Sequence, residues 1–183
     1  MTLGAIQGND ALIEKMGFQI AQQCKRMGVH INYAPVVDVN NNPNNPVINF
    51  RSFGENRDAV TNKSLAYMRG LQKGGIITSA KHFPGHGDTG VDSHYDIPVL
   101  THSRNRLDSL ELFPYRELIK KGLQGVMVGH LSIPALDTTA MLASTMSKPI
   151  VTGLLRDSLK FEGLVFTDAM DMKGATKMFP EGQ

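Results

Sequence analysis

The sequence lacks several features that would narrow its class. Cys24 is its only cysteine, so no internal disulfide can form and cysteine usage does not indicate a compartment. Lysine and arginine form no run and the net charge is only +2, which gives no case for a nucleic-acid or membrane-surface partner. No apolar stretch approaches the ~20 residues of a membrane span, and residues 1–5 do not resemble a signal peptide. Localisation, cytoplasmic or periplasmic, is therefore undetermined.

What the sequence does contain is typical of one globular domain over residues 1–183. Its length, with 41% hydrophobic and 20% charged residues, suits a folded chain with a sizeable core. Apolar runs predict four strands, and amphipathic or capped runs predict four helices that alternate with them. The predicted strands cover residues 29–39, 75–80, 125–131 and 163–168, and the predicted helices cover 10–27, 58–73, 104–121 and 147–160.

Each predicted strand is a short apolar run without polar alternation, as in a parallel sheet that is buried on both faces. The predicted fold class is therefore α/β, with parallel strands and intervening helices. In such folds the functional site lies at the C-terminal ends of the strands. The polar residues that stand out all follow strands: Asp38, Arg51, Lys81 with His82, His130 and Asp168.

Residues 81–94, KHFPGHGDTGVDSH, place three histidines, two aspartates and a lysine within fourteen residues. Within it, Asp92 and His94 stand two positions apart on a predicted loop. A carboxylate beside an imidazole favours the protonated ring, and such a pair can give and then take a proton near neutral pH. The alternative is a loop turn with an ordinary surface histidine. His86, between two glycines, is expected to hold the loop through hydrogen bonds.

The remaining candidates each allow two interpretations. Asp168 ends the last predicted strand, where a carboxylate serves either as a nucleophile or as the N-cap of a helix. Lys81 and His82 can hydrogen-bond a sugar or another polyol, although Lys81 can equally pair with a buried acid. Arg51 can bind a hydroxyl or carboxylate, or form a structural salt bridge. The histidines and aspartates of residues 82–94 could hold a metal, but their spacing matches no metal signature.

Taken together, KHFPGHGDTGVDSH and the later LVFTDAMDM resemble the N-terminal catalytic domain of family three glycoside hydrolases, and most closely its β-N-acetylglucosaminidase branch. NYAPVVDVN, NFRSFGE and VMVGHLSIPALD occur in the family's order, so the resemblance covers nearly the whole chain. It implies His94 as the acid/base, Asp92 as its partner and Asp168 as the nucleophile. It also implies that no metal or organic cofactor is needed, and that three residues contact the sugar: Arg51, Lys81 and His82.

The resemblance implies a retaining hydrolase of terminal β-linked N-acetylglucosamine, acting on glycans or peptidoglycan fragments. The family domain is a (β/α)-barrel of about eight strands. Four predicted strands therefore indicate a partial TIM-type barrel, the central part of such a domain in a fragment or truncated product. Two alternatives are an inactive carbohydrate-binding or interaction module and a metal-dependent hydrolase. Open barrel edges predict pairing with another chain, most simply in a homo-oligomer.

Overall fold

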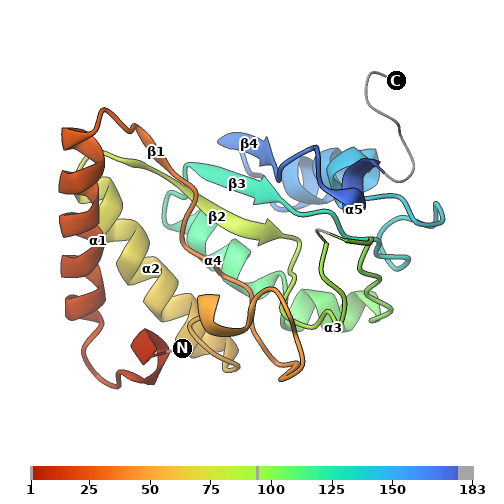
Figure 1. The fold of residues 1–183 in the computed structure, drawn as a ribbon, viewed down its shortest axis with the longest axis horizontal. Helices are drawn as coiled ribbons and strands as arrows, with labels where there is room; N and C mark the ends of the chain where they lie inside the picture. The colour runs from red at the N-terminus through yellow and green to blue at the C-terminus, as the bar shows by residue number, and fades with distance from the viewer. Residues whose placement is uncertain (1, 94, 177–183) are drawn as a thin grey trace.

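The computed structural model describes residues 2–93 and 95–176, and these form one parallel sheet with helices (Figure 1). The strand order is β1-β2-β3-β4, and all three neighbouring pairs are parallel. The strands are β1 (Ile31–Asn32), β2 (Ile77–Phe83), β3 (Gly125–Val128) and β4 (Leu164–Thr167). This arrangement confirms the predicted parallel α/β class with four strands. No helix in the described part of the chain is long and apolar enough to cross a membrane.

The α-helices are α1 (Asp10–Arg26), α2 (Arg57–Lys73), α3 (Arg104–Ser109), α4 (Phe113–Lys120) and α5 (Lys173–Thr176). Shorter or differently wound helices are η1 (Thr2–Ala5), η2 (Asn49–Arg51), η3 (Ser144–Met146) and the π-helix η4 (Pro149–Ser158). The predicted helices over 10–27, 58–73 and 147–160 match α1, α2 and η4 within a few residues. α1 packs lengthwise against α2 because glycines allow the close approach: a Cβ on Gly70 would lie 2.1 Å from the Glu14 carbonyl oxygen.

Proline explains two of the differences from the predicted extents; in addition, β2 continues to Phe83 and β3 ends at Val128, three residues before the predicted end. The predicted strand over 29–39 is only two residues long, because Ala34 N–H turns back to Asn32 O over 2.8 Å and Pro35, which follows, has no N–H to donate to the ladder. The chain nevertheless stays beside β2, where Val37 N–H donates to Lys81 O over 2.9 Å. The single helix predicted over 104–121 is divided into α3 and α4, because Pro114 cannot continue a helix from residue 110 but fits the first turn of a new one.

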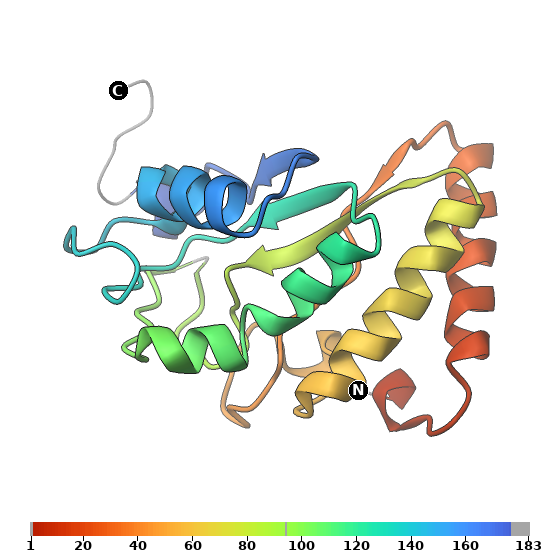
Figure 2. The ribbon, with the colours of Figure 1, turned by 180° about the vertical axis from the view of Figure 1, so that it is seen from behind.

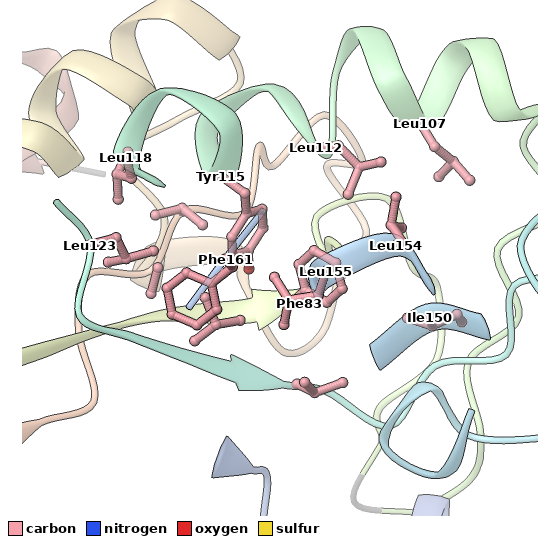
Figure 3. Packing of buried hydrophobic residues seen from close by; sticks show 14 of the residues in the cluster. Phe83, Leu107, Leu112, Tyr115, Leu118, Leu123, Ile150, Leu154, Leu155 and Phe161 are labelled. Atoms are coloured by element: carbon pink, nitrogen blue, oxygen red, sulfur yellow. The ribbon is translucent and has the colours of Figure 1, made fainter. Parts of the chain in front are cut away.

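The helices gather on one face of the sheet, which is clearest from behind, where α2, α4 and η4 lie in front of the strands (Figure 2). The main hydrophobic core fills the space between this helical layer and the sheet (Figure 3). Its centre is the edge-to-face contact of Phe83 in β2 with Tyr115 in α4, whose ring centroids are 5.1 Å apart. Each large apolar side chain that is fully buried here stabilises the fold by about 1.5–3 kcal/mol.

The opposite face of the sheet is covered by none of the described helices (Figure 1). β3 is fully buried, but no residue of β4 is, and Leu164 is 47% exposed. The expectation that every strand is buried on both faces is therefore wrong for β4, and also for β1, whose two residues are only partly buried. Tyr33 and Phe166 meet edge to face on this open side, with their ring centroids 5.1 Å apart. The open face leads directly to the C-terminal ends of the strands.

Candidate active site

A small cavity of about 70 Å³ lies where β2 and β4 end. It is lined by Val47, Arg51, Lys81, His82, His86, Ser93 and Asp168. Four of these are predicted site residues, and they come from η2, from β2 and from the end of β4. A wider hollow of about 530 Å³ opens beside it, on the uncovered face of the sheet, and shares Lys81 and Asp168 with it. A third hollow of about 620 Å³, near Phe53 and the N-terminal segment, contains none of the predicted site residues.

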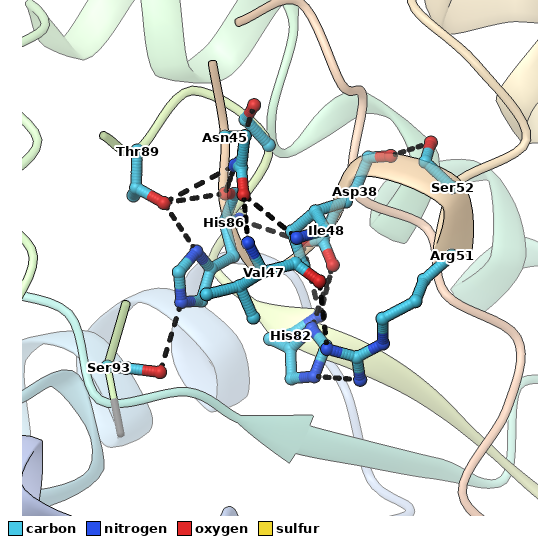
Figure 4. A network of polar contacts seen from close by, with 11 residues as sticks. Asp38, Asn45, Val47, Ile48, Arg51, Ser52, His82, His86, Thr89 and Ser93 are labelled. Carbon is cyan, nitrogen blue, oxygen red and sulfur yellow. Dashed lines mark hydrogen bonds and ion pairs between the residues drawn. The ribbon is translucent and has the colours of Figure 1, made fainter. Parts of the chain in front are cut away.

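Asp38 lies behind the small cavity and holds two of its lining residues, His82 and His86 (Figure 4). Its fully buried carboxylate accepts hydrogen bonds from His82 Nδ1 at 2.8 Å and from His86 N at 2.7 Å, and lies 3.2 Å from His82 N. Burial acts to raise the pKa of this carboxyl, but the two imidazoles and these hydrogen bonds outweigh it, so the pKa lies below its ordinary value. Asp38 is therefore ionised, and it fixes both histidines at once.

The contact between Arg51 and His82 identifies which ring nitrogen of His82 carries a proton. Arg51 Nη2 lies 3.2 Å from His82 Nε2. A guanidinium can only donate, so Nε2 accepts this bond and Nδ1 carries the hydrogen that points to Asp38. The Asp38–His82–Arg51 chain thus orients a neutral imidazole and a guanidinium at the cavity. Arg51 forms no salt bridge with any described residue. The alternative that Arg51 serves in a structural salt bridge is therefore not supported.

Lys81 lies within β2, one residue before His82, so the strand predicted over 75–80 ended too early in the sequence. Its side chain is half-buried and lines both the small cavity and the wider hollow. Burial and the nearby Arg51 guanidinium lower the pKa of Lys81, while Asp168 and Asp38 oppose that shift. The described residues form no ion pair with Lys81, so its pairing with an acid stays a prediction.

Asp168 follows β4 directly and is only partly exposed. Its Oδ1 accepts a hydrogen bond from Ala169 N–H at 2.9 Å, which is a local turn of the capping kind. Within the described part of the chain, no hydrogen bond reaches its other oxygen. His130 fixes the next residue, since His130 Nε2 lies 2.9 Å from Ala169 O and Nδ1 lies 2.9 Å from Thr145 Oγ1. Asp168 thus has one restrained oxygen and one available oxygen at the cavity.

The loop after β2 is held by buried polar groups. His86 is 1% exposed, with Nδ1 at 2.7 Å from Thr89 Oγ1 and Nε2 at 3.2 Å from Ser93 Oγ. Burial lowers the pKa of His86 to about 4 despite the opposing charge of Asp38, so the ring is neutral at neutral pH. Asn45 Nδ2 donates to His86 O at 2.8 Å. This agrees with the prediction that His86 holds the loop.

Of the predicted dyad, only Asp92 can be placed. Its carbonyl oxygen accepts hydrogen bonds from Tyr95 N at 3.0 Å and Asp96 N at 3.1 Å, so it starts a tight turn. His94 lies outside the described residues. Ser93, between them in sequence, lines the same cavity as Asp168. Among the residues that the structure describes, no three or more histidine, cysteine, aspartate or glutamate side chains are grouped to hold a metal ion.

Sequence reasoning gave no role to two residues that organise this site. Asp38 was visible only as a polar residue near the end of a strand. Asn45 stands in an asparagine- and proline-rich loop, where nothing in the sequence distinguishes it from its neighbours. In the structure its Oδ1 accepts from Val47 N and Ile48 N, at 2.9 and 2.8 Å, while its Nδ2 donates to the loop after β2. The local sequence signals a turn, but not which distant loop that turn contacts.

Comparison with known proteins shows what this chain is similar to. The model of the glycosyl hydrolase family 3 N terminal domain matches residues 1–182. Beta-hexosaminidase A of Pseudoalteromonas piscicida is 41% identical over 191 residues, which cover 98% of this chain and 32% of that protein. A beta-hexosaminidase of Neisseria meningitidis serogroup C is 35% identical over 161 residues, which cover 88% of this chain and 44% of that protein.

Among solved structures, a glycoside hydrolase family 3 beta-N-acetylglucosaminidase from a Paenibacillus species has a TM-score of 0.94 and 41% identity. The match covers 98% of this chain and 34% of that one. The similarity confirms the predicted fold class, a parallel α/β fold of TIM-barrel type that is present here as a partial barrel. The chain spans 32–44% of the length of these relatives.

Proposed function

We propose that this chain, which belongs to glycosyl hydrolase family 3, carries the catalytic centre of a retaining hydrolase that removes terminal β-linked N-acetylglucosamine from glycans or peptidoglycan fragments. The observation that carries the proposal is the small cavity, where Arg51, Lys81, His82 and Asp168 meet from separate segments of the chain. The names of the relatives support the same substrate class. They also favour this function over an inactive carbohydrate-binding module or a metal-dependent hydrolase.

In the proposed reaction, Asp168 is the nucleophile. Its available oxygen attacks the anomeric carbon and forms a glycosyl ester, while the glycosidic bond breaks and the leaving oxygen takes a proton from His94. Asp92, two residues away in sequence, stabilises the protonated imidazole of His94. A water molecule then attacks the same anomeric carbon, gives its proton to His94 and releases Asp168. The two inversions retain the configuration of the sugar.

The sugar contacts would come from the other side of the cavity. Arg51 and Lys81 present N–H donors, which suit the hydroxyl oxygens of a pyranose ring. His82 Nε2 is an acceptor because Nδ1 donates to Asp38, but it already accepts from Arg51, so a sugar hydroxyl would bind Nε2 by replacing that N–H. A hydroxyl that donates to Nε2 and accepts from Lys81 would therefore be bound in one orientation. This donor and acceptor pattern is set before the substrate arrives, because the His82 ring is buried and hydrogen-bonded.

The decisive experiment is the hydrolysis of a chromogenic N-acetylglucosaminide by the wild-type chain and by Asp168→Asn. An amide forms no glycosyl ester, so we expect the variant to lose activity by at least about a thousandfold. Asp171→Asn, three residues away on the same segment, is the matched control and should keep most of the activity. A slow fluorinated substrate should label the peptide that contains Asp168. An active Asp168→Asn variant, or label on another peptide, would contradict the proposed nucleophile.

We further propose that residues 1–183 form a single domain, the central part of a (β/α)-barrel, and that its open side is covered by a second copy of the chain. The support is the uncovered face of the sheet, with Tyr33 at 44% and Leu164 at 47% exposed. Leaving apolar surface in water costs roughly 25 cal/mol per Å². Light scattering at low protein concentration should therefore report a dimer. A monomer that unfolds cooperatively would contradict this assembly.

A further inference from the structure

We propose that Ser93 and Gly174 are positioning residues, which fix the loop that carries Asp92 and His94 against the segment that follows Asp168. This inference rests on the proposed function, since it concerns the separation of the proposed acid/base from the proposed nucleophile. The contacts that carry it are those of Ser93 with His86 on one side and with Gly174 on the other. These three residues are called the Ser93 clamp below.

Ser93 is bound through both its side chain and its backbone. The residue is only 2% exposed, although it belongs to a loop. Its Oγ lies 3.2 Å from His86 Nε2, and its carbonyl oxygen accepts the Gly174 N–H at 3.1 Å. Asp92 and His94 are its two neighbours in sequence. Because a peptide unit restrains the residue that precedes it, fixing Ser93 restrains Asp92, which is one member of the proposed dyad.

The His86 side of the clamp is rigid because it belongs to the buried polar network of Figure 4. The second ring nitrogen of His86 contacts Thr89 Oγ1 at 2.7 Å, and its backbone N–H donates to Asp38 at 2.7 Å. Asn45 Nδ2 donates to the His86 carbonyl oxygen. The imidazole that contacts Ser93 is therefore held at its other nitrogen, at its N–H and at its carbonyl oxygen. Asp38, which orients His82, is thus connected to the dyad through His86 and Ser93.

The Gly174 side requires a residue without a side chain. A Cβ at this position would lie 2.8 Å from Ser93 O and 3.1 Å from the Cβ of His130, both closer than packed atoms normally approach. Only glycine lets α5 come near enough to donate to Ser93 O. His130 in turn contacts Ala169 O. The segment after Asp168 is therefore fixed near both of its ends, once through Ala169 and once through the clamp.

The proposed reaction explains why the hydrogen bond between Gly174 and Ser93 would matter for catalysis. A retaining glycosidase needs its nucleophile and its proton donor about 5 Å apart, across the sugar. A misplacement of about 1 Å can cost about a hundredfold in rate. Asp168 and the dyad lie on different loops, separated by more than seventy residues of sequence. In the described part of the chain, the hydrogen bond between Gly174 and Ser93 joins these two segments directly, so it sets their separation.

The test compares Ser93→Ala and Gly174→Ala with the wild-type chain on two N-acetylglucosaminides, one with a nitrophenyl and one with an alkyl leaving group. Only the alkyl group needs a well-placed proton donor in order to leave. We expect kcat/KM for the alkyl substrate to fall at least about tenfold more than kcat/KM for the nitrophenyl substrate. This ratio is independent of how much of each preparation is folded, because both substrates are measured on the same sample.

Two matched controls make the same substitutions, Ser→Ala and Gly→Ala, at positions away from the Ser93 clamp. Ser64→Ala deletes a fully buried hydroxyl in α2, and Gly153→Ala adds a Cβ in η4 where no atom lies within 4 Å. Both controls should leave the ratio unchanged. If Ser93→Ala and Gly174→Ala lower kcat/KM equally on the two substrates, the ratio stays at its wild-type value. That result would overturn the proposal while leaving the glycosidase function intact.

A second measurement needs no activity. Hydrogen–deuterium exchange should be at least about tenfold faster in peptides that span residues 88–102 of Ser93→Ala and Gly174→Ala than in the wild type or the controls. Unchanged exchange in both variants would overturn the clamp. A wild-type chain that hydrolyses neither substrate but shows the expected exchange would instead contradict the proposed function and leave the clamp supported.

Discussion

Replacing the buried carboxylate of Asp38 by an amide should destabilise the fold and also disturb the sugar site. Asp38→Asn keeps the shape of the side chain but removes its charge and places an NH₂ group opposite one donor. If the amide oxygen keeps the bonds to His86 N and His82 N, the NH₂ faces His82 Nδ1–H, which donates over 2.8 Å in the wild type. The ring then loses its acceptor, or it moves the proton to Nε2, where it opposes Arg51.

The magnitude follows from the bonds involved. A hydrogen bond to a charged group contributes about 1.5–3 kcal/mol, and a buried donor that is left without an acceptor costs about 1–3 kcal/mol. We therefore expect Asp38→Asn to lower the free energy of unfolding by about 3 kcal/mol in urea titrations at pH 7. KM for the chromogenic substrate should rise, because His82 and Arg51 lose their fixed orientation.

Asp157→Asn is the control for this prediction, since it makes the same change at an exposed position of η4. It should alter the free energy of unfolding by no more than about 0.5 kcal/mol. A second check is the ring tautomer, because nitrogen chemical shifts should place the His82 hydrogen on Nδ1 in the wild type. A loss of less than about 1 kcal/mol for Asp38→Asn, or a hydrogen on Nε2 in the wild type, would refute the argument.

Two further predictions concern the dyad and the loop. His94→Ala should slow alkyl leaving groups far more than nitrophenyl ones, with Asp92→Asn acting in the same direction but less strongly; equal losses across a leaving-group series would assign His94 a binding role. For His86, burial lowers the pKa from 6.5 to about 4. As the pH falls from 6.5 to 4, the unfolded chain binds a proton at this ring that the folded chain does not bind, so the free energy of unfolding falls by up to about 3 kcal/mol; above pH 6.5 there is no such loss. Because glutamine does not titrate, urea titrations of His86→Gln should show a correspondingly smaller fall in the free energy of unfolding over that range.

The elements of the fold were largely predictable because each depends on nearby residues. The apolar runs that predict β3 and β4, and the amphipathic pattern of α1 and α2, are complete within the element itself. The errors arose where one residue overrides such a pattern. Pro35 interrupts the first strand and Pro114 starts a new helix, although both lie in apolar surroundings that otherwise favour continuation.

The site was predictable only in its reactive groups. Asp168 and Lys81 are visible because charged side chains are unusual beside apolar strands. The groups that orient them form contacts over long distances in sequence, such as Asp38 with His82, 44 residues apart, and Asn45 with His86, 41 residues apart. Nothing in either local sequence specifies its partner, because an aspartate after a strand and an asparagine in a turn are both common. Only the folded chain identifies these pairs.

The separation of reactive groups from the groups that orient them also explains how partly exposed side chains can be held in fixed positions at this site. Asp168 and Lys81 line both the small cavity and the wider hollow beside it, and partly exposed side chains of this kind have little packing to hold them. Their orientation must therefore come from groups behind them. Asp38, His86 and Ser93 are each at least 98% buried and hydrogen-bonded. A buried polar group without a partner costs about 1–3 kcal/mol, so a change at any of the three propagates to the others. Substitutions in this buried layer should consequently alter the chemistry of residues that they do not touch.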